Sequence, residues 1–346
     1  MTTTRTGRML ISAAAFVIVV AGVRAAGDIV APVMLALALT IVFHPLRAVF
    51  ERRVPSWAAS VLVLVLAYVL LIGLTVALVV SIGRLAALIP TYATDLDDIA
   101  ARVGDGLDSL GVAEPEAEAV TDQLDLGGVL DAAMSFLSSI VAVLSNLFFI
   151  LTLLVFLAFD SAQVASLSSA AREHRPELVD ALVSFARGTR TYLGVSAVFG
   201  LIVAVIDTLM LWALDIPEPF VWGVLAFVTN FIPNIGFVIG VIPPALIGLL
   251  EDGPGLMLLV IVLYSAVNLV IQSIIQPRFV GQAVGLATTL TFLSLIFWTW
   301  VLGPLGALLA VPMSLLLKAI LIDADPDGGW RGRLVSGRPD DPAAES

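Results

Sequence analysis

Two stretches of this sequence are too long and too apolar to be single helices. Residues 219–250 form a run of 32 residues without a charge, and residues 279–317 form a run of 39. As straight helices they would measure about 48 and 58 Å, whereas the apolar core of a bilayer is about 30 Å thick. Each run must therefore fold back on itself inside a membrane, which makes the chain an integral membrane protein.

The composition supports this conclusion. Only 13% of the 346 residues are charged, which is about half of the roughly 25% that is usual in soluble domains. Further runs with at most one charge lie at 9–23, 29–43, 57–83, 132–159 and 191–214. We therefore predict an all-α, polytopic helical membrane protein with about eight membrane segments, two of them broken or re-entrant helical hairpins. The lipid bilayer is its first expected partner.

The distribution of charge predicts the orientation of the chain. Arginines cluster in the loops expected on the cytoplasmic side, at Arg5, Arg8, Arg47, Arg52, Arg53, Arg172, Arg175, Arg187 and Arg190. Eleven acidic residues gather in segment 84–135, which then lies outside. Positive charge near spans favours the inside, so both termini are expected in the cytoplasm. Only Arg24 stands on the wrong side, where its long side chain can reach the interface. The acidic segment also argues against nucleic-acid binding.

The two long runs carry turn signals near their midpoints. The residues expected to form hairpin turns or gates are Pro233, Gly236, Pro243, Gly303, Pro304 and Gly306. Acids flank the first run and bases flank the second, so the hairpins should enter the membrane from opposite sides. Together with the preceding helices, 191–214 and 255–275, they predict an inverted repeat of the kind found in secondary transporters. Gly253-Pro254-Gly255 is interpreted as a plain loop between spans.

The predicted organisation has five parts. They are N-terminal transmembrane helices at 1–83, an acidic extracytoplasmic segment at 84–135, a transmembrane helix with a short cytoplasmic amphipathic helix opened by Pro176 at 136–190, a transport core with both hairpins at 191–322, and a disordered cytoplasmic tail at 323–346.

Polar residues inside the core predict a substrate or ion path. Asp207 is the one ionisable group inside a predicted span, the run 191–214, and such groups are by default functional. The remaining candidates are amides, namely Asn230 and Asn234 at the first hairpin turn and Asn268, Gln272 and Gln276 on one face of the inward helix. Each has a structural alternative: helix-packing hydrogen bonds for the helical residues and turn chemistry for the two at the hairpin.

The sequence contains none of the motifs that would indicate an enzyme, a nucleotide-binding protein or a metalloprotein. The chain has no cysteine, and we find no Walker A motif, no HExxH, no Ser/His/Asp set and no dinucleotide fingerprint. We therefore expect neither enzymatic activity nor a catalytic residue, a bound cofactor or a metal site.

The string Asn230-Phe-Ile-Pro-Asn-Ile-Gly236, followed by Gln276-Pro-Arg-Phe-Val-Gly281, Gly303-Pro-Leu-Gly306 and Ala310-Val-Pro312, resembles the autoinducer-2 exporter (AI-2E) family. The resemblance implies a bacterial cytoplasmic membrane, transport of small molecules and homo-oligomeric assembly. Some members are linked to export of a furanone-like signal, and others to sodium/proton exchange. Many relatives carry a glutamate before the Gln-Pro-Arg motif, where this chain has Asn268 and Gln272.

Taken together, these features favour a secondary transporter, facilitator or exporter of a small polar solute, with Na⁺ or H⁺ as the candidate coupling ion. A sodium/proton antiporter of the same family and a non-transporting membrane scaffold stay open as alternatives.

Overall fold

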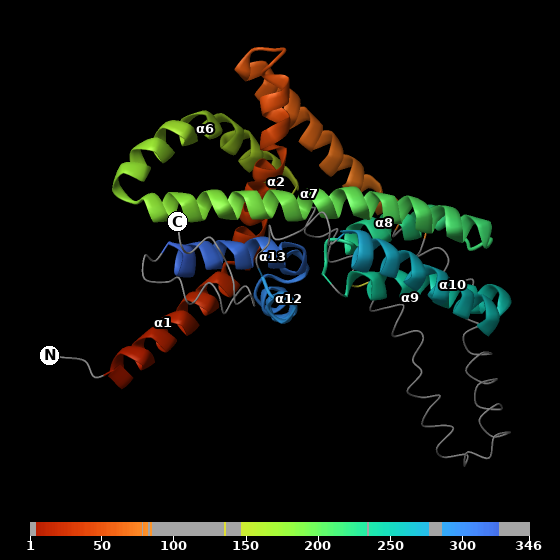
Figure 1. Ribbon diagram of the computed structural model, residues 1–346. Coiled ribbons are helices and arrows are strands. Elements are labelled where there is room, and N and C mark those ends of the chain that lie inside the picture. Colours follow the sequence, from red (N-terminus) through yellow and green to blue (C-terminus); the bar gives the residue numbers. More distant parts are fainter. Residues whose placement is uncertain are drawn as a thin grey trace. The chain divides into compact units, whose positions relative to one another are not determined.

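The computed structural model describes residues 5–77, 79–81, 84, 135, 147–233, 235–276 and 286–324, and these are helical or in short turns, with no strand among them. The helices are α1 (Arg5–Ala25), α2 (Gly27–Phe50), helix Ser56–Ser81, α6 (Leu147–His174), α7 (Pro176–Ala213), α8 (Pro219–Thr229), α9 (Gly236–Asp252), α10 (Pro254–Asn268), π-helix η1 (Leu269–Ile275), α12 (Thr288–Leu302), α13 (Pro304–Lys318) and π-helix η3 (Ala319–Asp323) (Figure 1). An all-helical architecture is what a bilayer demands, because a helix satisfies its own backbone polar groups.

Five of the described helices are long and apolar enough to cross a membrane. They are Gly27–Phe50, Ser56–Ser81, Pro176–Ala213, Pro254–Gln272 and Pro304–Asp323. Shorter apolar helices accompany them, including α8 and α12. The predicted all-α, polytopic fold is confirmed. The chain divides into two compact units, unit 1 (1–71, 145–195 and 280–346) and unit 2 (72–144 and 196–279).

Unit 1 is built on a small apolar core between α2, helix Ser56–Ser81 and α6. Its buried residues are Ala36, Phe43, Ala67, Leu71, Ile150 and Leu154. At the end of α2 the chain reverses through Glu51, whose carboxylate accepts hydrogen bonds from the Ser56 hydroxyl and the Arg47 guanidinium, both at 2.9 Å. The Ser56 hydroxyl and then Arg47 hold the pKa of the Glu51 carboxyl below its ordinary value.

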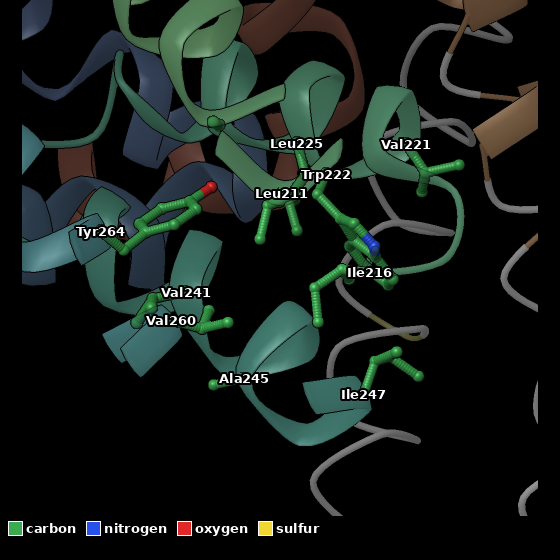
Figure 2. Close-up of a cluster of buried hydrophobic side chains, with 11 residues drawn as sticks. Leu211, Ile216, Val221, Trp222, Leu225, Val241, Ala245, Ile247, Val260 and Tyr264 are labelled. Atoms are coloured by element: carbon green, nitrogen blue, oxygen red, sulfur yellow. The ribbon is translucent and has the colours of Figure 1, made fainter. Parts of the chain in front are cut away.

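Unit 2 has a larger core, to which α7, α8, α9 and α10 all contribute. It comprises Leu211, Ile216, Val221, Trp222, Leu225, Ala226, Val241, Ala245, Ile247, Val260 and Tyr264 (Figure 2). Two of these side chains carry polar atoms, the Trp222 ring nitrogen and the Tyr264 hydroxyl. The Trp222 ring N–H donates to the Pro217 carbonyl at 2.9 Å, which ties the start of α8 to the connection from α7.

The first uncharged run breaks where its turn signal predicts. Helix α8 ends at Thr229, and α9 begins at Gly236. A Cβ atom on Gly236 would lie 1.9 Å from the Thr229 carbonyl oxygen, so only glycine permits the two helix ends to approach this closely. Pro243 does not belong to this turn, because it lies inside α9.

The second run breaks in a similar way. Helix α12 ends at Leu302, Gly303 has φ +67°, and Pro304 is the first residue of α13. A Cβ on Gly306 would lie 1.9 Å from the Trp298 carbonyl oxygen. Glycine at the start of the second helix therefore lets each hairpin close.

The Gly253-Pro254 junction is more than the plain loop expected from the sequence. Gly253 has φ +79° and is followed by a helix that opens with proline, as at Gly303-Pro304. Helices α10 and α13 each have 15 residues, and each continues directly into a π-helix. The segments α9–α10–η1 and α12–α13–η3 thus have the same order of elements: a helix, a positive-φ glycine, a 15-residue helix that opens with proline, and a π-helix. The inverted repeat, which pairs other segments, stays a prediction.

Helix α7 differs from expectation. The sequence predicted a short surface helix after Pro176 and a separate span from residue 191, whereas α7 is one continuous helix of 38 residues. No proline interrupts it after its first residue, so the backbone has no reason to break where polarity changes. Pro32 lies inside α2 as its sixth residue, because the helix begins at Gly27, ahead of the apolar run at 29–43.

Several predicted features lie outside the described residues. These are almost all of segment 84–135, the Gln-Pro-Arg motif from Pro277 onward, Asn234, and the tail after residue 324. The expected orientation and the five-part division stay predictions.

Candidate functional site

Three side-chain amides meet inside unit 2 and form a connected hydrogen-bonded group, which we call the amide cluster (Asn230, Asn268 and Gln272). The Gln272 amide donates to the Asn230 side-chain oxygen at 2.9 Å and to the Asn268 side-chain oxygen at 2.6 Å. Asn268 donates to the Tyr264 carbonyl at 2.9 Å. Asn230 donates to the Ser196 carbonyl at 2.8 Å. The cluster therefore links α7, the end of α8, α10 and η1.

The local backbone explains how these amides come together. Asn230 is the residue at which α8 stops, and Gly200 on α7 leaves room for it, because a Cβ there would lie 2.9 Å from the Asn230 amide nitrogen. Asn268 ends α10, and Gln272 lies in the middle of η1. Turns of π-helix inside α-helices occur frequently at functional sites. Every member of the cluster thus sits at an interruption of regular helix.

The amide cluster keeps unused hydrogen-bonding capacity. An amide side chain offers two N–H donors and one oxygen acceptor. Both Gln272 donors are used, but its oxygen accepts no hydrogen bond from a described residue, and Asn230 and Asn268 each use one donor of two. Asn230 and Asn268 are buried and Gln272 is half-buried. A group with one free acceptor and two free donors in an apolar span can bind a polar molecule.

Asp207 forms a second polar position in unit 2. Its side chain is fully buried, and neither carboxylate oxygen has a hydrogen-bond partner among the described residues. The Tyr264 hydroxyl lies near enough to interact with this carboxyl, but the geometry falls short of a formed hydrogen bond. An isolated carboxylate is costly to bury and must be neutralised by a proton or a cation.

Tyr264 connects the two polar positions. Its hydroxyl faces Asp207, while its backbone carbonyl accepts the hydrogen bond from Asn268. A Cβ placed on Gly240 would lie 3.6 Å from the Tyr264 hydroxyl and 3.3 Å from that of Thr229. Because Gly240 has no side chain, the Thr229 and Tyr264 hydroxyl groups can both approach the α9 backbone at this residue.

The structure brings together some of the predicted path residues and not others. Asn268, Gln272 and Asn230 are in direct contact. Asp207 is eleven residues along α7 from Ser196, which is about 16 Å of helix, and among the described residues Tyr264 lies between it and the cluster. Gln276 ends η1, where its backbone N–H donates to the Ile271 carbonyl, but its side chain makes no hydrogen bond to a described residue. Asn234 is outside the described residues.

Sequence reasoning missed Tyr264, Ser196 and Gly200. An aromatic residue on an apolar span looks like ordinary core, and a backbone carbonyl acceptor leaves no mark in a sequence. Spacing offered one usable signal, since Tyr264 precedes Asn268 by four residues and so lies on the same helix face.

Comparison with known proteins identifies the family of the chain. The model of the AI-2E family transporters matches residues 12–324. The chain belongs to the AI-2E family. The AI-2 transport protein TqsA of Escherichia coli is 34% identical over 322 residues, which cover 91% of each chain. A putative transport protein of Haemophilus influenzae is 32% identical over 332 residues, covering 92% of this chain and 93% of its own. The putative transport protein YhhT of E. coli is 30% identical over 311 residues, covering 90% and 89%.

Membership confirms the resemblance seen in the sequence motifs and supports a transporter role. AI-2E family proteins are transporters, and the chain is a multi-pass membrane protein with several apolar spanning helices.

Proposed function

We propose that this AI-2E family transporter moves a small polar solute across the bacterial cytoplasmic membrane by way of the amide cluster, acting as a secondary transporter or facilitator that exports its solute. Both termini lie in the cytoplasm in this proposal. The observation that carries it is the unused capacity of Asn230, Asn268 and Gln272, buried at interruptions of helix. Broken helices are where secondary transporters build their binding sites.

The chemistry of the cluster indicates the class of solute. One acceptor and two donors within a few ångströms suit a neutral molecule with several hydroxyl or carbonyl groups. TqsA is named for the transport of AI-2, so AI-2 is the first solute to test. A non-transporting scaffold would have no use for such donors and acceptors within its spans.

A sodium/proton antiporter is the second candidate function, and Asp207 is the observation that favours it. A fully buried carboxyl without a hydrogen-bond partner among the described residues can take up a proton or a sodium ion as part of a transport cycle. In the leading proposal the same carboxyl would couple solute movement to an ion gradient.

The test is a flux measurement in proteoliposomes with a panel of small polar solutes that includes AI-2. Gln272→Leu and Asn268→Leu should each lower flux at least tenfold, equivalent to about 1.4 kcal/mol. Thr152→Val is the matched control, because the one hydrogen bond of the Thr152 hydroxyl to a described residue lies within its own helix, to the Phe148 carbonyl at 2.7 Å. It removes one polar group from a span outside the cluster and should leave flux unchanged.

Imposed gradients separate the two candidates. Solute flux without any effect of sodium or pH gradients indicates a facilitator, and sodium-driven proton movement without solute indicates the antiporter. Normal flux in both amide variants, at matched abundance in the vesicles, would remove the amide cluster from the transport path.

A further inference from the structure

An open groove runs along unit 1 between α1 and α12, and neither the amide cluster nor Asp207 belongs to it. It has a volume of about 610 Å³, and its walls include Phe16, Val17 and Val20 of α1 and Phe297 of α12. The α1 residues recur at steps of three and four, so they form one face of that helix. Phe16 and Val17 are mostly exposed. In a membrane protein, lipid is the medium available to such a surface.

One end of this groove carries a positive charge. The Arg24 guanidinium lies 4.2 Å from the centre of the Trp300 ring, a cation–π contact. Arg24 makes no ion pair with a described residue, and this includes Asp28, which follows it by four positions. The Arg24 N–H groups make no hydrogen bond to a described residue, and a guanidinium can hold a phosphate with two parallel hydrogen bonds.

The dimensions of the groove match one leaflet of a bilayer. From Arg24 to Phe16 is eight residues, or about 12 Å along the helix, and half of the apolar core of a bilayer is about 15 Å. Trp300 lies near the end of α12, and tryptophans concentrate at the level of the headgroups. The turn between α1 and α2 is at the same level, because a Cβ on Gly27 would lie 3.6 Å from the Val301 carbonyl oxygen.

We propose that this groove binds one phospholipid, with its phosphate on Arg24 beside Trp300 and an acyl chain against Phe16, Val20 and Phe297. The charge and the apolar wall occur in the order and at the spacing of a lipid headgroup and its chain. The position of Arg24, opposite to what the positive-inside pattern predicts for this end of α1, then has a reason. Lipid at this site would hold α1 against α12.

Native mass spectrometry of the full chain in detergent tests the proposal with three probes. Dioleoyl-phosphatidylglycerol carries both parts of the ligand, dioleoylglycerol has the same tails without phosphate, and glycerol 3-phosphate has the headgroup without tails. We expect about one phosphatidylglycerol retained per chain at this site, and at least fivefold less retention of the other two. Arg24→Gln should lower retention of phosphatidylglycerol at least fivefold, and Trp300→Leu should lower it about threefold.

The control is Arg53→Gln, which removes an equal charge from the exposed loop after α2 and should leave retention unchanged. Thermal unfolding in lipid-free detergent confirms that each variant is folded. If Arg24→Gln does not fold, Arg24→Lys replaces it, and the loss of the planar fork should then lower retention two- to threefold. Equal retention by an Arg24 variant and the wild type, or of dioleoylglycerol and phosphatidylglycerol, would overturn the proposal. A third result would also overturn it: a Val17→Cys variant that forms disulfide-linked dimers, together with phosphatidylglycerol retention that the Arg24 variants do not change. That result would show that a second copy of the chain covers this face.

Discussion

The closest backbone approach in the first hairpin gives a quantitative prediction for Gly236→Ala. The new Cβ would lie 1.9 Å from the Thr229 carbonyl oxygen and 2.7 Å from its carbon. Ordinary carbon–oxygen contacts in proteins begin at about 3.3 Å, so the two backbone segments must separate by about 1.4 Å. The two Thr229 atoms belong to the backbone, and the position of an alanine Cβ is fixed by its own backbone. No side-chain rotation can therefore relieve the overlap.

The cost of this separation has two sources. Overpacking in a closely packed site costs about 1–3 kcal/mol. The hydrogen bond from the Gly236 N–H to the Ile232 carbonyl, 3.1 Å long, is in the same turn, and its loss adds about 1 kcal/mol. We therefore expect Gly236→Ala to lower the free energy of unfolding by about 2–4 kcal/mol. Asn230 follows Thr229 directly, so the same movement should stretch its hydrogen bond to Ser196 and lower flux at least tenfold.

Unfolding of the purified protein in mixed micelles of detergent and SDS measures the first effect, and flux in proteoliposomes measures the second. Gly255→Ala is the matched control, since Gly255 lies in α10 with a helical, negative φ and nothing within 4 Å of its added Cβ. It should be neutral or stabilising by up to about 1 kcal/mol. Gly306→Ala should destabilise as Gly236→Ala does, because its added Cβ would also lie 1.9 Å from a backbone carbonyl oxygen, that of Trp298. If Gly236→Ala has the stability and flux of Gly255→Ala, the reasoning is refuted, because α8 and α9 then do not need glycine at this position to form the hairpin.

Two further predictions concern Asp207 and the topology. Asp207→Asn should abolish any dependence of flux on a proton or sodium gradient while the protein still folds. Tyr264→Phe should shift that dependence without abolishing it. If Asp207→Asn keeps its gradient dependence and changes only the unfolding midpoint, Asp207 is a packing residue. The chain has no cysteine, so Ser109→Cys and Ser168→Cys give single-cysteine proteins without further changes. In intact cells an impermeant thiol reagent should label the first and not the second, and the opposite pattern would invert the predicted orientation.

The sequence predicted the helical membrane fold because its decisive features are local. A run of 39 uncharged residues excludes a single span, and proline with glycine near its centre marks the place where the helix ends. Gly236 and Gly306 were assigned to the hairpins on this basis, and each is where a side chain would collide with the preceding helix.

Other features depend on contacts between distant residues, and the sequence could not predict them. The sequence does not predict the continuity of α7, because the change from polar to apolar residues near residue 191 favours a boundary that nothing in the backbone requires. Asn268 and Gln272 were paired correctly by their four-residue spacing. Their junction with Asn230 and the meeting of Tyr264 with Asp207 depend on how α7, α8 and α10 pack, which no spacing along one helix reveals.

The π-helical segment that follows Asn268 gives the amide cluster an adjustability that an α-helical turn lacks. A π turn holds about one residue more than an α turn, and its hydrogen bonds run from residue i to i+5. The surplus residue can pass along the backbone by exchanging one or two hydrogen bonds at a time, with the ends of the span left in place. Gln272, in the middle of this segment, would then swing its side chain away from Asn230 without unfolding of the helix. The hydrogen bond between Gln272 of η1 and Asn230 at the end of α8 could thus form and break through a change of register within a single helical turn.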